Sequence, residues 1–292
     1  MSFCAVGLCA DSGQRDRPGP IRAGRAKVVA MPETDEYSAT RPLSGKIAII
    51  TGAGQGVGLG IALALAADGA AVAALGRTPD RLADTCAAIR ARGGTASPFT
   101  CDVADTAAIP GVVEDVVAEF GGVDILVNNA YTGAYGPLLS LSEEDFRLGF
   151  QTAPFAAFAF MKAVHPHFKA RGGGDIVNLV TSAMVRWDPT TYGGYAAAKQ
   201  ALRSLTRTAA VEWAPDGIRA NSIAPHALSP GLERWTKRNP EEAEAFVATI
   251  PMRRIGDPER DIGRAVAALV GPDLRYLTGA TLPLDGGQAF FG

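Results

Sequence analysis

The sequence predicts an α/β fold, a doubly wound parallel β-sheet with helices on both faces, formed as a single domain. Short apolar runs of strand length, such as 47–50 and 124–127, alternate along the chain with longer segments rich in Ala and Leu. This alternation is typical of parallel strands that are joined by crossover helices. The composition, 47% hydrophobic and 20% charged residues, is that of an ordinary globular protein with enough chain for one sizeable core.

The individual elements follow from apolar runs bounded by turn residues. The expected strands are 47–50, 71–75, 97–101, 124–127, 175–180, 219–223 and 280–284. The expected helices are 58–68, 81–92, 112–120, 155–169, 195–213 and 261–270. Glycine clusters at 93–94, 121–122 and 172–174 end three of these helices. The segment from about 226 to 251 is expected to be a substrate loop.

The first 42 residues differ from the rest, since they contain Gly, Pro, Arg, Ser and Asp without a sustained apolar period. We expect residues 1–42 to be a disordered or loosely attached tail, and 43–292 to be the domain. Met31 lies within this tail, and translation beginning there is one hypothesis. The N-terminus lacks the basic residues of a signal peptide, and no apolar run approaches the ~20 residues that span a bilayer.

Charge and cysteine content exclude several classes of partner. The formal net charge of -2 gives no reason to expect nucleic acid or an anionic membrane. The four cysteines form no CxxC pair, so we expect reduced thiols in a cytoplasmic protein. No His, Cys, Asp or Glu cluster has the spacing of metal ligands, and we expect no catalytic metal.

A glycine-rich loop joins the first expected strand to the first expected helix. It reads Thr-Gly-Ala-Gly-Gln-Gly-Val-Gly over residues 51–58. Glycines permit positive φ angles and lack the Cβ atoms that would obstruct a pyrophosphate, while the helix N-terminus offers free N–H groups to the phosphates. A tight turn without function would look similar, but a strand before and a helix after are the context of a dinucleotide site in a Rossmann-type fold.

The end of the second expected strand bears on which dinucleotide is used. An NAD site usually has an acidic residue there, which binds the ribose 2′-hydroxyl. Here the strand ends in Leu75-Gly76-Arg77, without Asp or Glu. The planar, permanently charged guanidinium of Arg77 suits a 2′-phosphate, although a solvated surface arginine is the alternative. NADP(H) is therefore favoured, with NAD(H) possible.

Tyr195 and Lys199 are four residues apart on an expected helix and so share one face. A nearby ammonium and a cationic nicotinamide ring favour the phenolate, so we expect both to lower the pKa of Tyr195 and make it a usable acid and base. Ser182 follows an expected strand, at the sheet edge where ligands of open α/β folds bind. There it would hydrogen-bond the substrate oxygen.

These motifs together resemble the classical short-chain dehydrogenase/reductase family. The loop has the spacing T-G-x-x-x-G-x-G, and it is followed in order by Asn-Asn-Ala at 128–130, by Ser182, by Tyr-Ala-Ala-Ala-Lys at 195–199, by Asn-Ser-Ile-Ala-Pro at 221–225 and by Asp-Gly-Gly at 285–287. The resemblance covers roughly residues 43–290. It implies that Ser182, Tyr195 and Lys199 are catalytic. It also implies a cofactor site made of Gly52, Gly54, Gln55, Gly56, Val57, Gly58, Arg77, Asp102, Val103, Asn129, Ala130, Tyr195, Lys199 and Pro225.

Within that site the resemblance implies that Asp102 accepts a hydrogen bond from the adenine amino group and that Lys199 grips the nicotinamide ribose. It further implies a homodimer or homotetramer. The expected helices 155–169 and 195–213 suit such assembly, because they carry more apolar residues than one buried face needs.

Three positions depart from the family pattern. The asparagine that commonly holds a water of the proton relay is replaced by Ala153. The usual Asn-Asn-Ala-Gly ends here in Tyr131, and the usual Pro-Gly after the sixth strand is Pro225-His226. His226 could assist proton transfer or bind an anionic group, or it could be a loop histidine without a special role.

The sequence therefore predicts an oxidoreductase that interconverts a ketone or aldehyde and an alcohol, with Tyr195 as general acid and base. A catalytically weak dinucleotide-binding or regulatory protein is the alternative, and an epimerase or dehydratase on the same fold is a third possibility. Residues 183–194 and 227–251 are expected to form the specificity region, which contains Met184, Arg186, Trp187, Tyr192, Leu232 and Trp235. This mixture suggests aromatic walls without naming a substrate.

Overall fold

The computed structural model describes residues 41–186 and 191–291. The expected tail, with Met31, and Trp187 of the specificity region lie outside the described residues, apart from the last two residues of the tail. Near the start of the described residues, Leu43 is almost fully buried, and its backbone N–H donates to the carbonyl of Asp68 at 2.8 Å.

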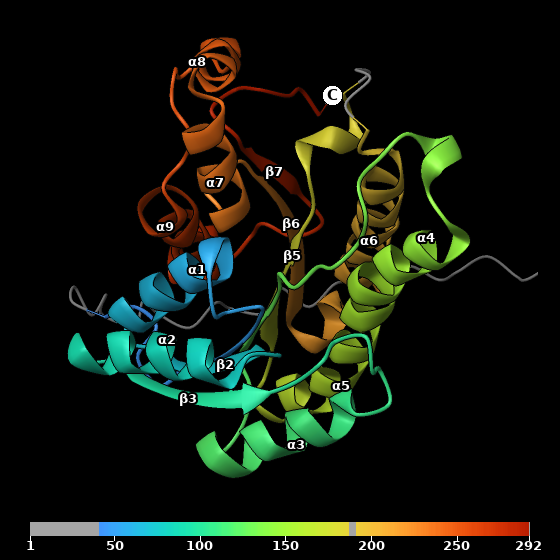
Figure 1. The fold of residues 1–292 in the computed structure, drawn as a ribbon. Coiled ribbons are helices and arrows are strands. Elements are labelled where there is room, and N and C mark those ends of the chain that lie inside the picture. The colour runs from blue at the N-terminus through green and yellow to red at the C-terminus, as the bar shows by residue number, and fades with distance from the viewer. Residues whose placement is uncertain (1–40, 187–190, 292) are drawn as a thin grey trace, which may run out of the picture. The chain divides into compact units, whose positions relative to one another are not determined.

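The centre of the domain is a sheet of seven parallel strands in the order β3-β2-β1-β4-β5-β6-β7 (Figure 1). The strands are β1 (Ile47–Thr51), β2 (Ala71–Gly76), β3 (Thr95–Thr100), β4 (Ile125–Asn128), β5 (Gly174–Leu179), β6 (Ile218–Pro225) and β7 (Thr281–Leu284). All seven expected strands are present, so the predicted fold class is confirmed. The strand order reverses between β1 and β4, and β3 and β7, which contain Pro98 and Pro283, form the two edges.

Helices cover both faces of this sheet (Figure 1). Those of the first half are α1 (Gly56–Ala67), α2 (Pro79–Ala91), α3 (Ile109–Phe120) and α4 (Glu143–Phe150), and those of the second half are α5 (Ala156–Ala170), α6 (Gly193–Glu212), α7 (Pro230–Arg238), α8 (Pro240–Thr249) and α9 (Arg264–Val270). The side chains of β1 alternate between two cores: Ala48 and Ile50 pack with α1, α2 and α9, while Ile47 and Ile49 pack with α3 and α5. Because helices cover both faces of this strand, residues 47–50 are all apolar. No helix in the described ranges is long and apolar enough to cross a membrane.

Three helices were not expected from the sequence, and two of them replace the expected loop at 226–251. In α4 the hydroxyl of Ser142 accepts from the backbone N–H of Asp145 at 3.0 Å, and in α7 Ser229 caps Leu232 in the same way at 3.2 Å. Prolines stand at the first turns of α7 and α8. These serine caps and N-terminal prolines are helix-start signals, so the interpretation of this segment as a loop was wrong.

The long helix expected from residue 155 is preceded by a π-helical turn, η2 (Gln151–Phe155). This turn joins α4 to α5 and contains Pro154 within it. The hydroxyl of Thr152 lies 2.6 Å from the carbonyl oxygen of Thr132 and 2.9 Å from that of Leu148, and its single proton is donated to one of them. π-Helical turns often occur at functional sites, and this one contains Ala153.

A buried polar network ties the strands to α6. The amide of Asn178, in β5, accepts from Asn128 of β4 at 2.8 Å and donates to the hydroxyl of Thr206 of α6 at 2.8 Å. Thr206 also accepts from Ser222 of β6 at 3.1 Å and donates to the carbonyl of Leu202 at 2.8 Å. Because these side chains are buried, each hydrogen bond lost would leave a partner without a replacement from solvent.

We predict that Thr206→Val will lower the free energy of unfolding by about 1–3 kcal/mol, because it leaves buried polar partners unsatisfied. Thr208→Val on the same helix is the matched control, since the exposed hydroxyl of Thr208 bonds only the Ser204 carbonyl of its own helix. The control should change stability by less than about 0.5 kcal/mol. Urea unfolding followed by circular dichroism measures both, and equal effects would contradict a role for the network.

Candidate active site

The glycine loop lies at the carboxyl end of β1, where the strand order reverses. Gly52 and Gly56 have φ angles of 67° and 54°, and a Cβ atom on Gly58 would lie 2.3 Å from the Gly52 carbonyl oxygen. At the start of α1 no side chain caps the backbone N–H groups, and its first turn contains no acidic residue. This backbone can therefore receive a pyrophosphate, as the fit of a dinucleotide requires.

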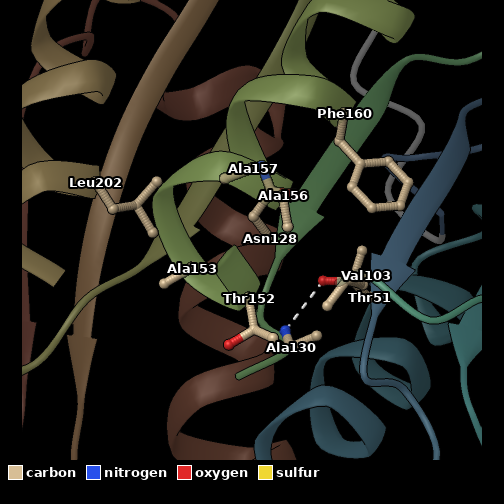
Figure 2. A pocket seen from close by; sticks show the side chains of 10 residues that line it. All are labelled: Thr51, Val103, Asn128, Ala130, Thr152, Ala153, Ala156, Ala157, Phe160 and Leu202. Atoms are coloured by element: carbon tan, nitrogen blue, oxygen red, sulfur yellow. Dashed lines mark hydrogen bonds between the residues drawn. The ribbon is translucent and has the colours of Figure 1, made fainter. Parts of the chain in front are cut away.

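Asn129 and Ala130 hold the loop in place. The hydroxyl of Thr51 accepts from the backbone N–H groups of Asn129 at 2.9 Å and Ala130 at 3.0 Å; the second bond is drawn in Figure 2. The Asn129 amide donates to the carbonyls of Thr51 at 2.8 Å and Gly52 at 3.2 Å. Asn129 and Ala130 thus hold the shape of the glycine loop through hydrogen bonds within the protein.

The exposed Arg77 follows β2, and its guanidinium donates to the Thr132 hydroxyl at 3.1 Å. A second guanidinium, that of Arg81 in α2, donates to the side chain of Gln55 in the glycine loop. The carboxylate of Asp102 is exposed and accepts from the backbone N–H of Ala104 at 3.0 Å, whereas Val103 is buried. This end of the site thus has the guanidinium groups of Arg77 and Arg81 near the glycine loop, and the carboxylate of Asp102 as an acceptor farther along the sheet edge.

Tyr195 and Lys199 lie in α6, with the Lys199 ammonium 5.8 Å from the centroid of the Tyr195 ring. Lys199 Nζ donates to the Leu179 carbonyl at 2.7 Å. Burial lowers the pKa of Lys199 to about 7. Burial also raises the pKa of Tyr195 well above its usual value, and a hydrogen bond with Thr181 offsets this only in part. Among this chain's own groups, removal from water outweighs the expected effect of Lys199 on the pKa of Tyr195, and the effect expected of a cationic nicotinamide ring stays a prediction.

Ser182 begins a short 3-10 turn, η3 (Ser182–Met184), directly after β5. Its hydroxyl donates to the carboxylate of Asp285 at 2.5 Å, and both side chains are buried. Asp285 also accepts from the backbone N–H groups of Gly287, Gln288 and Ala289 at 3.0–3.1 Å. The sequence placed Ser182 toward the substrate oxygen, whereas here its proton is donated to a carboxylate from the far end of the chain.

Three further tyrosines surround Tyr195. Their ring centroids lie 4.7 Å (Tyr131), 5.6 Å (Tyr135) and 6.3 Å (Tyr192) from that of Tyr195. Tyr135 and Tyr192 are exposed, and their rings meet edge to face at 5.4 Å. The sequence indicated only Tyr192 as a pocket wall. For Tyr131 and Tyr135, the one signal in the sequence was that a tyrosine stands at residue 131 where the family motif has glycine.

Ala153 is buried in the π-helical turn and borders a cavity of about 10 Å³ between β4 and α5 (Figure 2). Asn128 and Thr152 are among the polar residues that line it. This volume is at the lower limit for one water molecule, which needs roughly 10–15 Å³. The backbone near Ala153 therefore has space for a single solvent molecule where family members commonly carry an asparagine.

His226, directly after β6, is half-buried and stacks edge to face on Phe246 of α8 at 5.4 Å. Burial lowers its pKa, and the nearby Asp285 offsets part of this shift. Among the described residues its buried Nδ1 has no hydrogen-bond partner. His226 and Asp285 line a cavity of about 290 Å³ at the ends of β6 and β7. No group of three or more His, Cys, Asp or Glu in the described part of the chain is placed to hold a metal.

Comparison with known proteins is consistent with this geometry. Residues 52–289 match the family model described as enoyl-(acyl carrier protein) reductase. A 12α-hydroxysteroid dehydrogenase from Clostridium sp. is 38% identical over 252 residues, which are 84% of this chain and 96% of that protein.

Solved structures show the same fold with bound cofactors. A 7α-hydroxysteroid dehydrogenase complexed with NADH and 7-oxo glycochenodeoxycholic acid superposes with a TM-score of 0.79 at 32% identity, covering 85% of this chain and 95% of that one. L-Sorbose reductase from Gluconobacter frateurii, complexed with NADPH and L-sorbose, has a TM-score of 0.78 at 30% identity, with coverages of 85% and 98%. From the glycine loop, the Tyr195–Lys199 pair and these relatives it follows that the chain belongs to the short-chain dehydrogenase/reductase family of oxidoreductases.

Proposed function

We propose that this protein transfers a hydride reversibly between NADP(H) and a ketone or secondary alcohol, with Tyr195 as the general acid and base. The observation that supports this most strongly is the placement of Tyr195 and Lys199 on one face of α6, at the carboxyl edge of the sheet beside the open glycine loop. Such an edge is where ligands of open α/β folds bind.

The nicotinamide of the bound cofactor would supply or accept the hydride. The phenol of Tyr195 is protonated at neutral pH, as burial raises its pKa further, and in reduction it would give this proton to the carbonyl oxygen as negative charge develops there. Two consecutive hydroxyls follow β5: Thr181 hydrogen-bonds Tyr195, and Ser182 donates to Asp285. Either hydroxyl could donate to the developing oxyanion, Ser182 only after its proton turns away from Asp285.

We further propose a fused-ring or other bulky cyclic alcohol as the substrate. Two of the relatives described above act on hydroxysteroids, as their names state. The exposed rings of Tyr135 and Tyr192 offer flat apolar surface beside Tyr195, which suits such a compound better than a short polyol. A panel of hydroxysteroids, sugars and aliphatic ketones with both cofactors tests this substrate class.

Tyr195→Phe should reduce turnover by about 10²-fold or more, because it removes the transferable proton and keeps the ring. Cofactor affinity, measured by fluorescence titration, should be retained. Tyr276→Phe is the matched control, since Tyr276 is fully exposed and should tolerate the change without effect. Unchanged turnover in Tyr195→Phe would remove this phenol from the mechanism, and absence of turnover in the wild type would favour a dinucleotide-binding protein with little catalysis.

Arg77→Asp should weaken NADP(H) binding by about tenfold or more while sparing NAD(H), since it places a negative charge where the 2′-phosphate would lie. Arg275→Asp is a control of equal charge change: Arg275 is exposed and follows Leu274, whose carbonyl is bound by Arg219 near the opposite, amino edge of the sheet. Isothermal titration of the wild type and both variants with each cofactor measures the six affinities. Tighter NAD(H) than NADP(H) binding in the wild type would overturn the cofactor assignment.

We also propose that the protein forms a homodimer or homotetramer. On α5 and the turn before it, Phe160 and Met161 are buried, whereas Phe155 and Phe158 are 55% and 46% exposed. Large apolar side chains on a second face indicate a contact surface.

The wild type should therefore have a mass in solution of two or four times the 30.3 kDa of one chain, and Phe158→Glu should shift this mass toward that of the monomer. Tyr276→Glu, at an exposed position outside α5, should not. Light scattering coupled to gel filtration distinguishes these outcomes, and a monomeric wild type at micromolar concentration would contradict the assembly.

A further inference from the structure

We propose that Tyr131 is a positioning residue, whose ring face holds the Lys199 ammonium beside Tyr195. This inference rests on the proposed role of Tyr195 as acid and base. Tyr131 stands where the family's Asn-Asn-Ala-Gly motif has its glycine, and its ring packs against Tyr195 and lies beside Lys199.

The position of Tyr131 is constrained by the backbone just before it and by the space around its hydroxyl. Its chain neighbour Ala130 is bound through its N–H to the Thr51 hydroxyl at 3.0 Å. Its own hydroxyl lies over two glycines: a Cβ atom would stand 2.2 Å from that oxygen at Gly133 and 3.1 Å at Gly149. Gly133 in particular leaves room that any other residue would fill, so the chain accommodates the full length of a tyrosine at this position.

The fixed ring faces the lysine of the candidate site. Lys199 Nζ lies 5.3 Å from the centroid of the Tyr131 ring and 5.8 Å from that of Tyr195, and the two rings pack at 4.7 Å. Both ammonium distances are within the roughly 6 Å over which a cation is attracted to an aromatic face. The ammonium thus lies beside two ring faces and donates one hydrogen bond, to the Leu179 carbonyl.

Other groups near Lys199 give its charge little support. The titratable groups that face it are the phenols of Tyr131 and Tyr195, with Tyr135 and Tyr192 packed behind them. Burial lowers the pKa of Lys199 to about 7. The ring faces of Tyr131 and Tyr195 and the Leu179 carbonyl lie close to Lys199 Nζ and favour its charged form.

A ring face favours the ammonium and so raises the pKa of Lys199 above the value that burial alone would give. A side chain of similar bulk without a ring should lower that pKa. Lys199 would then carry less charge at neutral pH.

The test compares Tyr131→Leu, which removes the ring, with Tyr131→Phe, which keeps the ring and removes the hydroxyl. The pKa of Lys199 is measured in the cofactor-free protein by NMR titration of ¹³Cε-labelled lysine, with the resonance assigned through its loss in Lys199→Arg. We expect Tyr131→Leu to lower this pKa by about half a unit to one and a half units, and Tyr131→Phe to leave it unchanged.

Equal pKa values of Lys199 in the wild type and both variants would show that Tyr131 only fills space, and would overturn the proposal. Equal decreases in both variants would do the same, because they would assign the effect to the hydroxyl. Should Tyr131→Leu fail to fold by circular dichroism, Tyr131→Ile makes the same comparison. A wild type without turnover would refute the proposed function, while the NMR titration would still decide the role of Tyr131.

Discussion

Hydrogen bonds through the buried amide of Asn178 determine how the sheet and α6 fit together. This amide links β4, β5 and α6, and β6 joins the network through Ser222 and Thr206. Lys199 stands about two turns before Thr206 on the same helix, and Ser182 follows the strand that contains Asn178. The register between the residues of the candidate site is therefore fixed by polar contacts inside the core. An apolar core would leave that register less well defined, because hydrophobic packing is not directional.

Burial has a second effect, on charge. The same enclosure that fixes α6 takes Lys199 and Tyr195 out of water, so that both favour their neutral forms. A site of this kind is adapted to hold a proton on the phenol and to release it only when charge appears nearby. The neighbouring rings and the Leu179 carbonyl then matter because they are among the few groups that can stabilise a cation there.

The sequence was sufficient for the strands and for the linear motifs, because both are local. Each buried strand is a short apolar run, and the glycine loop and the Tyr195–Lys199 pair are recognisable from spacing alone. The bond between Ser182 and Asp285 joins residues far apart in sequence, and no local pattern reports it. The tyrosines around Tyr195 come together from a loop and a helix start, which becomes visible only in the fold. The direction of the Tyr195 pKa was misjudged because burial could not be known from residue types. The helices α7 and α8 were missed although their start signals, Ser229 with Pro230 and later Pro240, were present.

The prolines at the two margins of the sheet limit how the protein can aggregate. Pro98 in β3 and Pro283 in β7 lack the N–H group that a strand needs to continue a ladder. Open parallel edges are otherwise templates for strand addition, domain swapping and fibril growth. Because each margin carries such an interruption, a partially opened molecule is less able to recruit further strands at either side. The domain thus resists one common route to insoluble assemblies while its helical faces remain available for specific contacts.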